Sequence, residues 1–247
     1  MSELSNLFQP IKVGPMTLAN RLSMSCMAGG LSLDADGYPT DRMIAYYAER
    51  AKSRPGMRGV GAGPAVVAFG GRMPHLQSVV LYDDGCVAPL RRFVDAIHEH
   101  DTKFGIQLWE GGVQAGGRVL LTPSGVGINA KAVGDKNVQS VMKTLELEEI
   151  ESMIEQFGSA GGGCVAAGFD FVEIHAGHGY LISSFLTPYF NHRTDRYGSA
   201  TFEDRTRFLV DILRAVKRRV GDAIAKPCVF DQRTAVLGLL PRDVFQS

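Results

Sequence analysis

Two histidines and a tyrosine stand close together in the stretch 170–181, directly after a run of apolar residues. His175 and His178 are three residues apart, so both imidazoles can approach one ligand atom, and each can donate a hydrogen bond to a carbonyl oxygen. Tyr180 supplies a hydroxyl that can give up a proton. The three residue types together indicate a site that holds a carbonyl group and delivers a proton beside it.

Other interpretations of these residues stay open on the residues alone. H-x-x-H is also a metal-ligand spacing, although no nearby Cys, Asp or third His completes a site. The two histidines can also be structural, each hydrogen-bonded to its surroundings, and Tyr180 alone can be a packing residue. His98 and His100 lie in the last turn of a predicted helix, where a cation suits the helix dipole, and they receive no function.

Strand-like and helix-like segments alternate along the chain. Strands are predicted at 21–27, 61–68, 104–109 and 169–174. Helices are predicted from Thr40, from Pro89, over 150–157 and from Thr201. Residues 110–143 are expected to be a loop, and the glycines at 158–163 have no explanation in the sequence. The alternation predicts a parallel β/α architecture, either a doubly wound sheet or an eightfold barrel, whose strand carboxyl ends hold the active site.

The composition is typical of one globular domain. The 247 residues are 45% hydrophobic and carry 26 basic and 26 acidic side chains, so no charge excess indicates a nucleic-acid partner. No apolar run approaches the ~18 residues of a membrane span. The N-terminus lacks a secretory pattern, and the four cysteines are too far apart for a C-x-x-C pair. We therefore expect a cytoplasmic protein with reduced thiols.

Several separated segments together resemble the old yellow enzyme family of NADH:flavin oxidoreductases. The segments are 7–14 with 20–21, 37–40 with 46–51, 107–109, and 175–181 followed by 185–188 and 191–198. The last group resembles the family's fourth strand and the loop after it. Each motif is weak alone, but their order along the chain, to about Gly221, identifies the chain as a member of the family.

The resemblance implies a TIM-type (β/α) barrel that binds FMN. It also implies that NADH or NADPH reduces the flavin, which then reduces the C=C bond of an α,β-unsaturated carbonyl or enoyl compound, as an ene-reductase does. In this scheme His175 and His178 bind the carbonyl oxygen, and Tyr180 protonates the α-carbon. Enolate charge builds on that oxygen during hydride addition, so two positioned donors stabilise the transition state most.

The resemblance also assigns residues to the flavin. Gln107 would hydrogen-bond the pyrimidine edge of the ring. The isoalloxazine would be lined by the side chain of Ala28 and by the backbone of Cys26, Met27 and Gly63. The family's fifth strand offers an arginine to the ring, and Arg233 is the candidate for that place. Arg193 and Asp195 are expected to order the loop after the fourth strand.

Some positions depart from the family pattern. Cys26 stands where the family usually has proline, and Glu110 and Val113 stand where its third strand often ends with histidine and arginine. An acid at Glu110 is expected to repel a flavin phosphate or a carboxylate substrate. The segment 226–234, which contains Arg233, resembles the family poorly.

The predicted barrel is incomplete. A barrel of this type needs eight strands and about 250 residues, whereas the fifth strand is expected only near Ala225. We therefore predict one domain over 1–247 that holds the first four to five β/α units, with a divergent tail at 222–247. The family's phosphate-binding seventh and eighth strands would have no counterpart.

Incompleteness leaves alternatives for function and assembly. One alternative is a catalytically silent truncated paralogue with weak or no flavin binding, and another is a parallel β/α enzyme that uses the two histidines for metal-assisted hydrolysis. The partners expected are a small unsaturated carbonyl substrate, with neither nucleic acid nor membrane. An open barrel would expose strand edges, which favours a homo-oligomer.

Overall fold

The apolar run Phe104–Trp109 forms the central strand of a five-stranded sheet in the computed structural model of the chain. The structure describes residues 5–24, 26, 33–52, 61–66, 79–81, 84–114, 119–127, 140–222 and 228–229. The strands are β1 (Ile11–Val13), β2 (Met16–Leu18), β3 (Gly61–Val66), β4 (Val79–Val80), β5 (Phe104–Trp109), β6 (Val119–Thr122), β7 (Val141–Thr144), β8 (Phe171–His175) and β9 (Cys228–Val229). The α-helices are α1 (Asp41–Ala51), α2 (Val87–His98), α3 (Leu147–Ala167), α4 (Leu181–Leu186) and α5 (Phe202–Val220), and 3-10 turns lie at Ser5–Phe8, Asp84–Cys86 and Gly112–Gln114.

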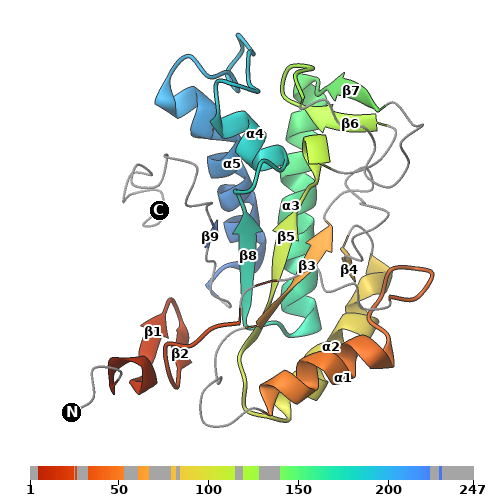
Figure 1. The fold of residues 1–247 in the computed structure, drawn as a ribbon, viewed down its shortest axis with the longest axis vertical. Helices are drawn as coiled ribbons and strands as arrows, with labels where there is room; N and C mark the ends of the chain where they lie inside the picture. Colours follow the sequence, from red (N-terminus) through yellow and green to blue (C-terminus); the bar gives the residue numbers. More distant parts are fainter. Residues whose placement is uncertain are drawn as a thin grey trace.

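The main sheet has the order β4-β3-β5-β8-β9, and each neighbouring pair is parallel. β3, β5, β8 and β9 lie across the sheet in chain order, whereas β4, which comes between β3 and β5 in the sequence, pairs with the other side of β3 (Figure 1). The predicted strands at 61–68, 104–109 and 169–174 are thereby confirmed, and each of their boundaries agrees with the structure to within two residues. β9 lies beside β8, where a fifth strand was expected near Ala225.

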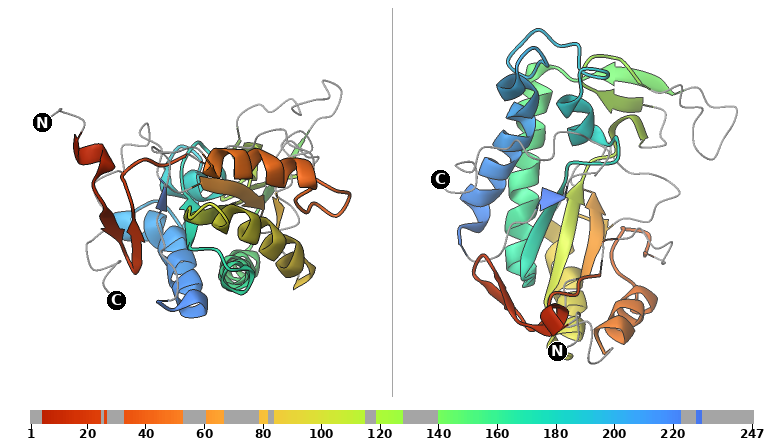
Figure 2. Two further views of the ribbon diagram at one scale, coloured as in Figure 1. Left: turned by 90° about the horizontal axis from the view of Figure 1, so that it is seen from below. Right: turned by 60° about the vertical axis from the view of Figure 1, so that its left-hand side comes forward.

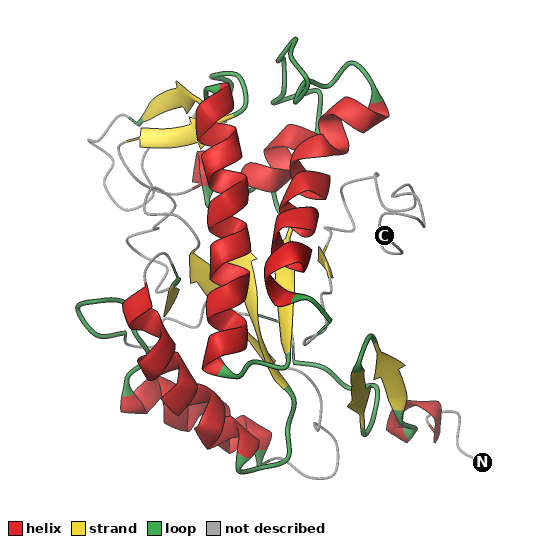
Figure 3. Ribbon diagram, turned by 180° about the vertical axis from the view of Figure 1, so that it is seen from behind, coloured by secondary structure: helices red, strands yellow, loops and turns green. Residues whose placement is uncertain are grey.

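Helices α2, α3 and α5 all pack on one face of this sheet. Their apolar residues form a single core with Ile106 and Leu108 of β5 and with Val172 and Ile174 of β8. α3 and α5 run side by side over that face when the molecule is seen from behind (Figure 3). A doubly wound sheet would carry helices on both faces, whereas a barrel carries them only outside. The arrangement therefore favours the barrel of the two architectures that the sequence allowed.

The four predicted helices are present, although α2 begins at Val87 rather than at Pro89, and α3 covers Leu147–Ala167 rather than 150–157. α1 starts after Thr40 as N-cap. In α2, apolar residues at helical spacing from Pro89 onward predict one buried face, and its four members are all buried: Leu90, Phe93, Val94 and Ile97. α5 starts at Thr201, whose hydroxyl oxygen accepts a hydrogen bond of 3.1 Å from the Asp204 backbone N–H. α3 starts with a capping box: the Glu146 side chain accepts the backbone N–H of Glu149, and the Glu149 side chain accepts the backbone N–H of Glu146.

Glycines inside α3 allow α5 to approach closely. A Cβ on Gly158 would lie 3.2 Å from the carbonyl oxygen of Ala215, and one on Gly161 would lie 3.2 Å from the side chains of Val216 and Val220. Both distances are shorter than ordinary van der Waals contacts of a Cβ atom, so larger residues at these positions would push the two helices apart. This packing explains Gly158 and Gly161 within the glycine-rich run at 158–163, whereas a Cβ on Gly162 or Gly163 would meet its nearest atom only at 3.9 Å.

Asp170 joins the starts of β5 and β8. Its carboxylate accepts the Phe104 N–H at 2.9 Å and contacts Lys103 Nζ and His98 Nε2, each at 2.7 Å. Its own N–H donates to the Phe104 carbonyl oxygen at 2.8 Å. These bonds fix the level at which β8 enters the sheet relative to β5. His98, which received no function from the sequence, thus has a structural partner.

One element was missed by the sequence, and two local predictions are wrong. Residues 11–18 form an antiparallel hairpin, β1–β2, that was not predicted, although Gly14-Pro15 between two alternating triplets is a turn signal. The strand predicted at 21–27 reduces, in residues 21–24 and 26, to a bridge at Met24, and β4 occupies the outer edge of β3 at Ala65 and Val66. The loop expected at 110–143 contains β6 and β7, which pair in parallel as a separate small sheet.

The hairpin closes the amino-terminal end of the sheet. Met16 and Leu18 of β2 form a small apolar cluster with Phe171, the first residue of β8. Figure 2 shows the hairpin at the foot of the strands, at the end opposite α4. Within the described residues, no helix is both long and apolar enough to span a membrane. Of the predicted tail at 222–247, Asp222 and β9 are described.

The close contact of α3 with α5 makes a testable prediction. We expect Gly158→Leu to lower the free energy of unfolding by about 1–3 kcal/mol, because the new side chain overlaps the Ala215 backbone. Gly162→Leu is the matched control, since a Cβ there meets only the Arg219 Cβ at 3.9 Å. Leucine also has a better helix propensity by about 0.8 kcal/mol. Urea unfolding followed by circular dichroism measures both, and equal losses would contradict the proposed packing role of Gly158.

Candidate active site

Alternate residues of β5 and β8 face away from the helices and line the inner side of the barrel segment. Ile106 and Leu108 belong to the core shared with the helices, so Gly105, Gln107 and Trp109 face the other way. In β8 the same alternation sends Phe171, Glu173 and His175 to the inner side. The register pairs Gly105 with Phe171 and Gln107 with Glu173.

The paired strands therefore present three layers. The lowest is an apolar floor, where the Phe171 ring lies over Gly105 and a Cβ at Gly105 would fall 2.3 Å from that ring. The middle layer holds the amide of Gln107 and the carboxyl of Glu173. The top layer, at the carboxyl ends of the strands, holds Trp109 and His175. Polar side chains thus lie between a closed floor and an upper aromatic layer.

The three residues that the sequence singled out come together at this upper end. The ring centroids of His175 and His178 are 4.8 Å apart, and those of His175 and Tyr180 are 5.0 Å apart. The Tyr180 ring also lies 4.9 Å from the Trp109 ring, centroid to centroid. Trp109 was not predicted as a site residue, although its place at the end of an alternating strand was a usable signal. One tyrosine and two imidazoles are within reach of a single small molecule.

Hydrogen bonds set the tautomers of the two imidazoles when both are neutral. The Gly177 N–H donates to His175 Nδ1 at 3.2 Å, so the ring proton of His175 is on Nε2. His175 Nε2 lies 3.0 Å from His178 Nδ1 and donates to it. The proton of His178 is then on Nε2. His175 is buried, with 7% of its surface exposed, whereas His178 is exposed, so the outer imidazole is the one that meets solvent or a ligand first.

The turn after β8 holds these side chains through backbone bonds. Gly179 has φ +76°, and a Cβ there would lie 2.7 Å from Gln114 Nε2, so glycine is needed for both reasons. The Gln114 amide donates to the His178 carbonyl oxygen. The Leu181 N–H donates to the Glu110 carbonyl oxygen at 3.1 Å and ties the start of α4 to the end of β5. The loops after β5 and β8 therefore form one unit.

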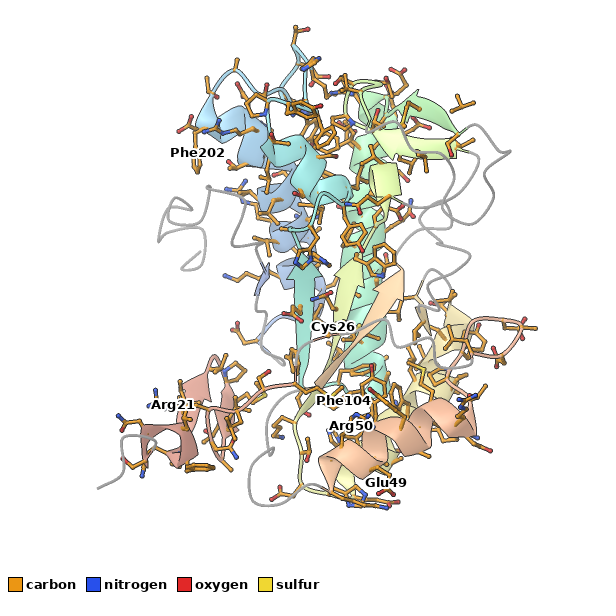
Figure 4. The ribbon with its side chains drawn as sticks, viewed as in Figure 1. Arg21, Cys26, Glu49, Arg50, Phe104 and Phe202 are labelled. Carbon is orange, nitrogen blue, oxygen red and sulfur yellow. The ribbon has the colours of Figure 1, made fainter. Side chains whose placement is uncertain are left out.

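Tyr180 and Cys26 lie in the same inner region. Burial raises the pKa of the Tyr180 hydroxyl, and a charge on Cys26 would raise it further. Burial likewise raises the pKa of the Cys26 thiol, with a smaller effect from Glu173. Cys26 is on the face of the sheet opposite α3 and α5 (Figure 4) and contacts the apolar floor. The tyrosine is thus kept as a neutral acid, and Cys26 as a neutral thiol, at ordinary pH.

The predicted flavin-contact residues are described only in part. Gln107 and Cys26 lie on the inner side, and Gly63 lies in β3 beside Ile106 of β5, one position from Gln107. Met27, Ala28 and Arg233 lie outside the described residues. Glu173 was not predicted, and the signal for it was a carboxylate between the apolar Val172 and Ile174 in a buried strand. Trp109 Nε1 is buried without a hydrogen-bond partner in the described part of the chain.

Arg193 and Asp195 make the contacts that their expected role requires. Arg193 Nε lies 3.1 Å from both carboxylate oxygens of Asp195, and Arg193 Nη1 donates to the carbonyl oxygens of Pro123 and Leu145. The Tyr197 N–H donates to Asp195 Oδ1 at 3.0 Å. The loop after α4 is thereby bound to the residues that follow β6 and β7.

A sequence model of the NADH:flavin oxidoreductase / NADH oxidase family matches residues 6–234. The chain belongs to this family. The chain is 36% identical over 213 residues to an NADPH dehydrogenase of Bacillus cytotoxicus and 35% identical over 212 residues to one of Bacillus subtilis, covering 86% of this chain in both cases. The resemblance seen in the sequence is thereby confirmed.

Solved structures of the family have the same fold. An Old Yellow Enzyme of a Pichia species and a homologue from Zymomonas mobilis both superpose with a TM-score of 0.76 and 29% sequence identity over 90% of this chain. The sheet is therefore part of a TIM-type barrel, as the family resemblance predicted. The chain spans about 59–60% of the length of the curated relatives it matches, and 59% and 63% of the two solved chains.

Glu110, at the end of β5, is a buried acid. It is 1% exposed, and neither carboxylate oxygen has a hydrogen-bond partner in the described structure. Burial raises the pKa of its carboxyl group to about 8, although the nearby amides of Gly111 and Gly112 favour the charged form. Glu110 is therefore mainly neutral near pH 7. The repulsion of anions that the sequence suggested is correspondingly absent there.

The raised pKa of Glu110 predicts a pH-dependent stability. Between the ordinary carboxyl pKa and about 8, the folded chain keeps a proton that the unfolded chain loses, so this group destabilises the fold increasingly as pH rises. We expect the free energy of unfolding of Glu110→Gln, relative to that of the wild type, to be larger at pH 8 than at pH 5.5. Urea unfolding at both pH values measures it, with the exposed Glu99→Gln as control. A gain that is independent of pH would contradict the buried neutral acid.

Proposed function

We propose that the chain carries the substrate-binding and proton-donating residues of an FMN-dependent oxidoreductase. Its reaction would use NADPH or NADH to reduce the C=C bond of an α,β-unsaturated carbonyl or enoyl compound. The observation that carries the proposal is the convergence of His175, His178 and Tyr180 over the inner face of β5 and β8. The NADPH dehydrogenases among the relatives support a nicotinamide as the electron source.

The inner face has the polar groups that a flavin ring needs. The pyrimidine edge of FMN alternates acceptors with one N–H donor, and the Gln107 amide offers both a donor and an acceptor. The partnerless N–H of Trp109 is a second buried donor on the same strand and face. Cys26 and the backbone of Gly63 lie beside the inner face and are further groups that would contact the ring. The described residues therefore fit the ring of the cofactor.

The histidines would hold the carbonyl oxygen of the substrate. When bound, FMN supplies the hydride that it has received from the nicotinamide. His178 presents its Nε2–H outward in the arrangement described, and His175 can donate its own Nε2–H to the same oxygen once the oxygen takes the place of His178 Nδ1. Two donors directed at the oxygen stabilise the enolate charge that develops there.

Tyr180 would donate the proton to the α-carbon. The raised pKa of its hydroxyl keeps the phenol protonated at neutral pH, as a proton donor must be. Its ring is held between Trp109 and His175, so the hydroxyl stays near the oxygen-binding imidazoles. No third His, Cys, Asp or Glu joins the histidines in a metal-binding group within the described residues, so nothing there favours metal-assisted hydrolysis.

Retention of flavin is the first test of the proposal. We expect the purified chain, mixed with FMN and passed through gel filtration, to elute with the visible absorption bands of the flavin. The physical reason is the polar inner face, whose Gln107 amide and Trp109 N–H can hydrogen-bond the flavin ring above the floor that Phe171 forms. Elution of a colourless protein would contradict the proposal and favour a silent paralogue.

Tyr180→Phe tests the proton-donating role. We expect it to slow reduction of an unsaturated ketone by about 10²–10⁴-fold, the usual value of a positioned general acid, because the phenol proton is lost. Reduction of the flavin by NADPH should stay nearly unchanged, since that step does not use the hydroxyl. Stopped-flow absorbance measures the two half-reactions separately.

The matched control for this variant is Tyr189→Phe, because Tyr189 is 69% exposed. It should leave both half-reactions at the wild-type rates. Equal slowing of both half-reactions in Tyr180→Phe would refute the assignment of Tyr180 as proton donor, since a general loss of flavin or of structure would explain it.

A further inference from the structure

Gln107 and Glu173 are direct neighbours across the β5–β8 ladder. Both face the inner side, in the layer between the Phe171 floor and the His175 level. Gln107 is 8% exposed, and Glu173 is half-buried. Glu173 follows Val172 and precedes Ile174, both of which are in the outer core, so its side chain cannot turn outward without a shift of the strand. A carboxyl group held on this partly buried inner face loses part of its hydration, so a specific partner is expected to compensate for it.

The interaction between these two side chains has a fixed sense. Burial raises the pKa of the Glu173 carboxyl, and the hydrogen bond between that carboxyl and the Gln107 amide offsets part of the rise because it stabilises the charged form. In its ionised form the Glu173 carboxylate only accepts hydrogen bonds, so in that form the Gln107 amide directs an N–H, and not its oxygen, toward Glu173. The other described titratable group that acts on this pair is the Cys26 thiol, which burial keeps neutral. The two ends of the Gln107 amide are thereby distinguished.

The choice of end matters for what Gln107 can bind. With one N–H held by Glu173, the amide oxygen and the second N–H point away from the carboxylate. That pair of groups, one acceptor beside one donor, matches the N3–H and a neighbouring carbonyl of a flavin pyrimidine edge. With the amide reversed, two donors would meet the N3–H, and one hydrogen bond would be lost.

We propose that Glu173 is a positioning residue that orients the Gln107 amide for the pyrimidine edge of the flavin. This inference rests on the proposed function, because it needs a flavin on the inner face. Glu173 does not itself touch the ring in this arrangement. By hydrogen-bonding one N–H of Gln107, Glu173 disfavours the reversed orientation of the amide. The flavin therefore binds to a side chain that is already in the binding orientation.

A double-mutant cycle on flavin binding tests this role. The variants are Glu173→Leu, Glu173→Gln, Gln107→Leu and the double Gln107→Leu/Glu173→Leu, and FMN is titrated with each by quenching of its fluorescence. We expect Glu173→Leu to weaken FMN binding by about tenfold, the equivalent of one hydrogen bond. Glu173→Gln should stay within about threefold of the wild type, because its carbonyl oxygen can accept the same N–H.

The cycle separates positioning from a structural effect. If Glu173 acts through Gln107, adding Glu173→Leu to Gln107→Leu should weaken binding no further, so the two effects should not add. N3-methyl FMN is a second probe, because it has no N3–H. The wild type should bind it less tightly than FMN, and Glu173→Leu should reduce that preference. The urea unfolding midpoint of each variant identifies a change in folding.

The results distinguish this inference from the proposed function. FMN binding by Glu173→Leu at the wild-type affinity, or effects of the two leucines that simply add, would overturn the positioning role while leaving the proposed function in place. If the wild-type chain binds no FMN, both fail together. If Glu173→Leu does not fold, Glu173→Gln decides through N3-methyl FMN, since loss of the wild-type preference in that variant would also overturn the inference.

Discussion

The parallel pairing of β5 with β8 is the constraint on which the site depends. Because side chains alternate along a strand, the register Gln107 opposite Glu173 sends one set of residues to the helices and the other to the inner face. A slip of one residue would exchange the two sets and bury Gln107 and Glu173 against α3. The chemistry proposed for the inner face therefore follows from one register.

Two features outside the site maintain that register. At the lower end, Asp170 binds the backbone of Phe104 and the side chains of Lys103 and His98, so β8 can enter the sheet at one level only. Behind the sheet, α3 can approach α5 because Gly158 and Gly161 leave room, and the two helices cover Val172 and Ile174. The polar residues in front are thus supported by packing behind.

At the upper end the loops carry the reactive groups, and their geometry comes from backbone contacts rather than from regular structure. The bonds Leu181 N–H to Glu110 and Gln114 to His178 join the loop after β5 to the loop after β8. The burial of Glu110 is a result of this junction, because the segment that carries it lies under the start of α4. A neutral acid there is compatible with a nearby anionic ligand, whereas a charged one would not be.

The sequence alone determined the local features of the protein. Apolar periodicity predicted α1, α2, α3, α5 and the strands β3, β5 and β8, and a short motif singled out His175, His178 and Tyr180, because these signals depend on residues a few positions apart. Gln107 was singled out by the family resemblance. The tertiary structure decided the rest. Pairing Gln107 with Glu173, burying Glu110, placing Trp109 against Tyr180 and folding the β1–β2 hairpin under Phe171 all bring together residues far apart in the chain. No local pattern reports such contacts, because they depend on strand register and on which helix covers which face.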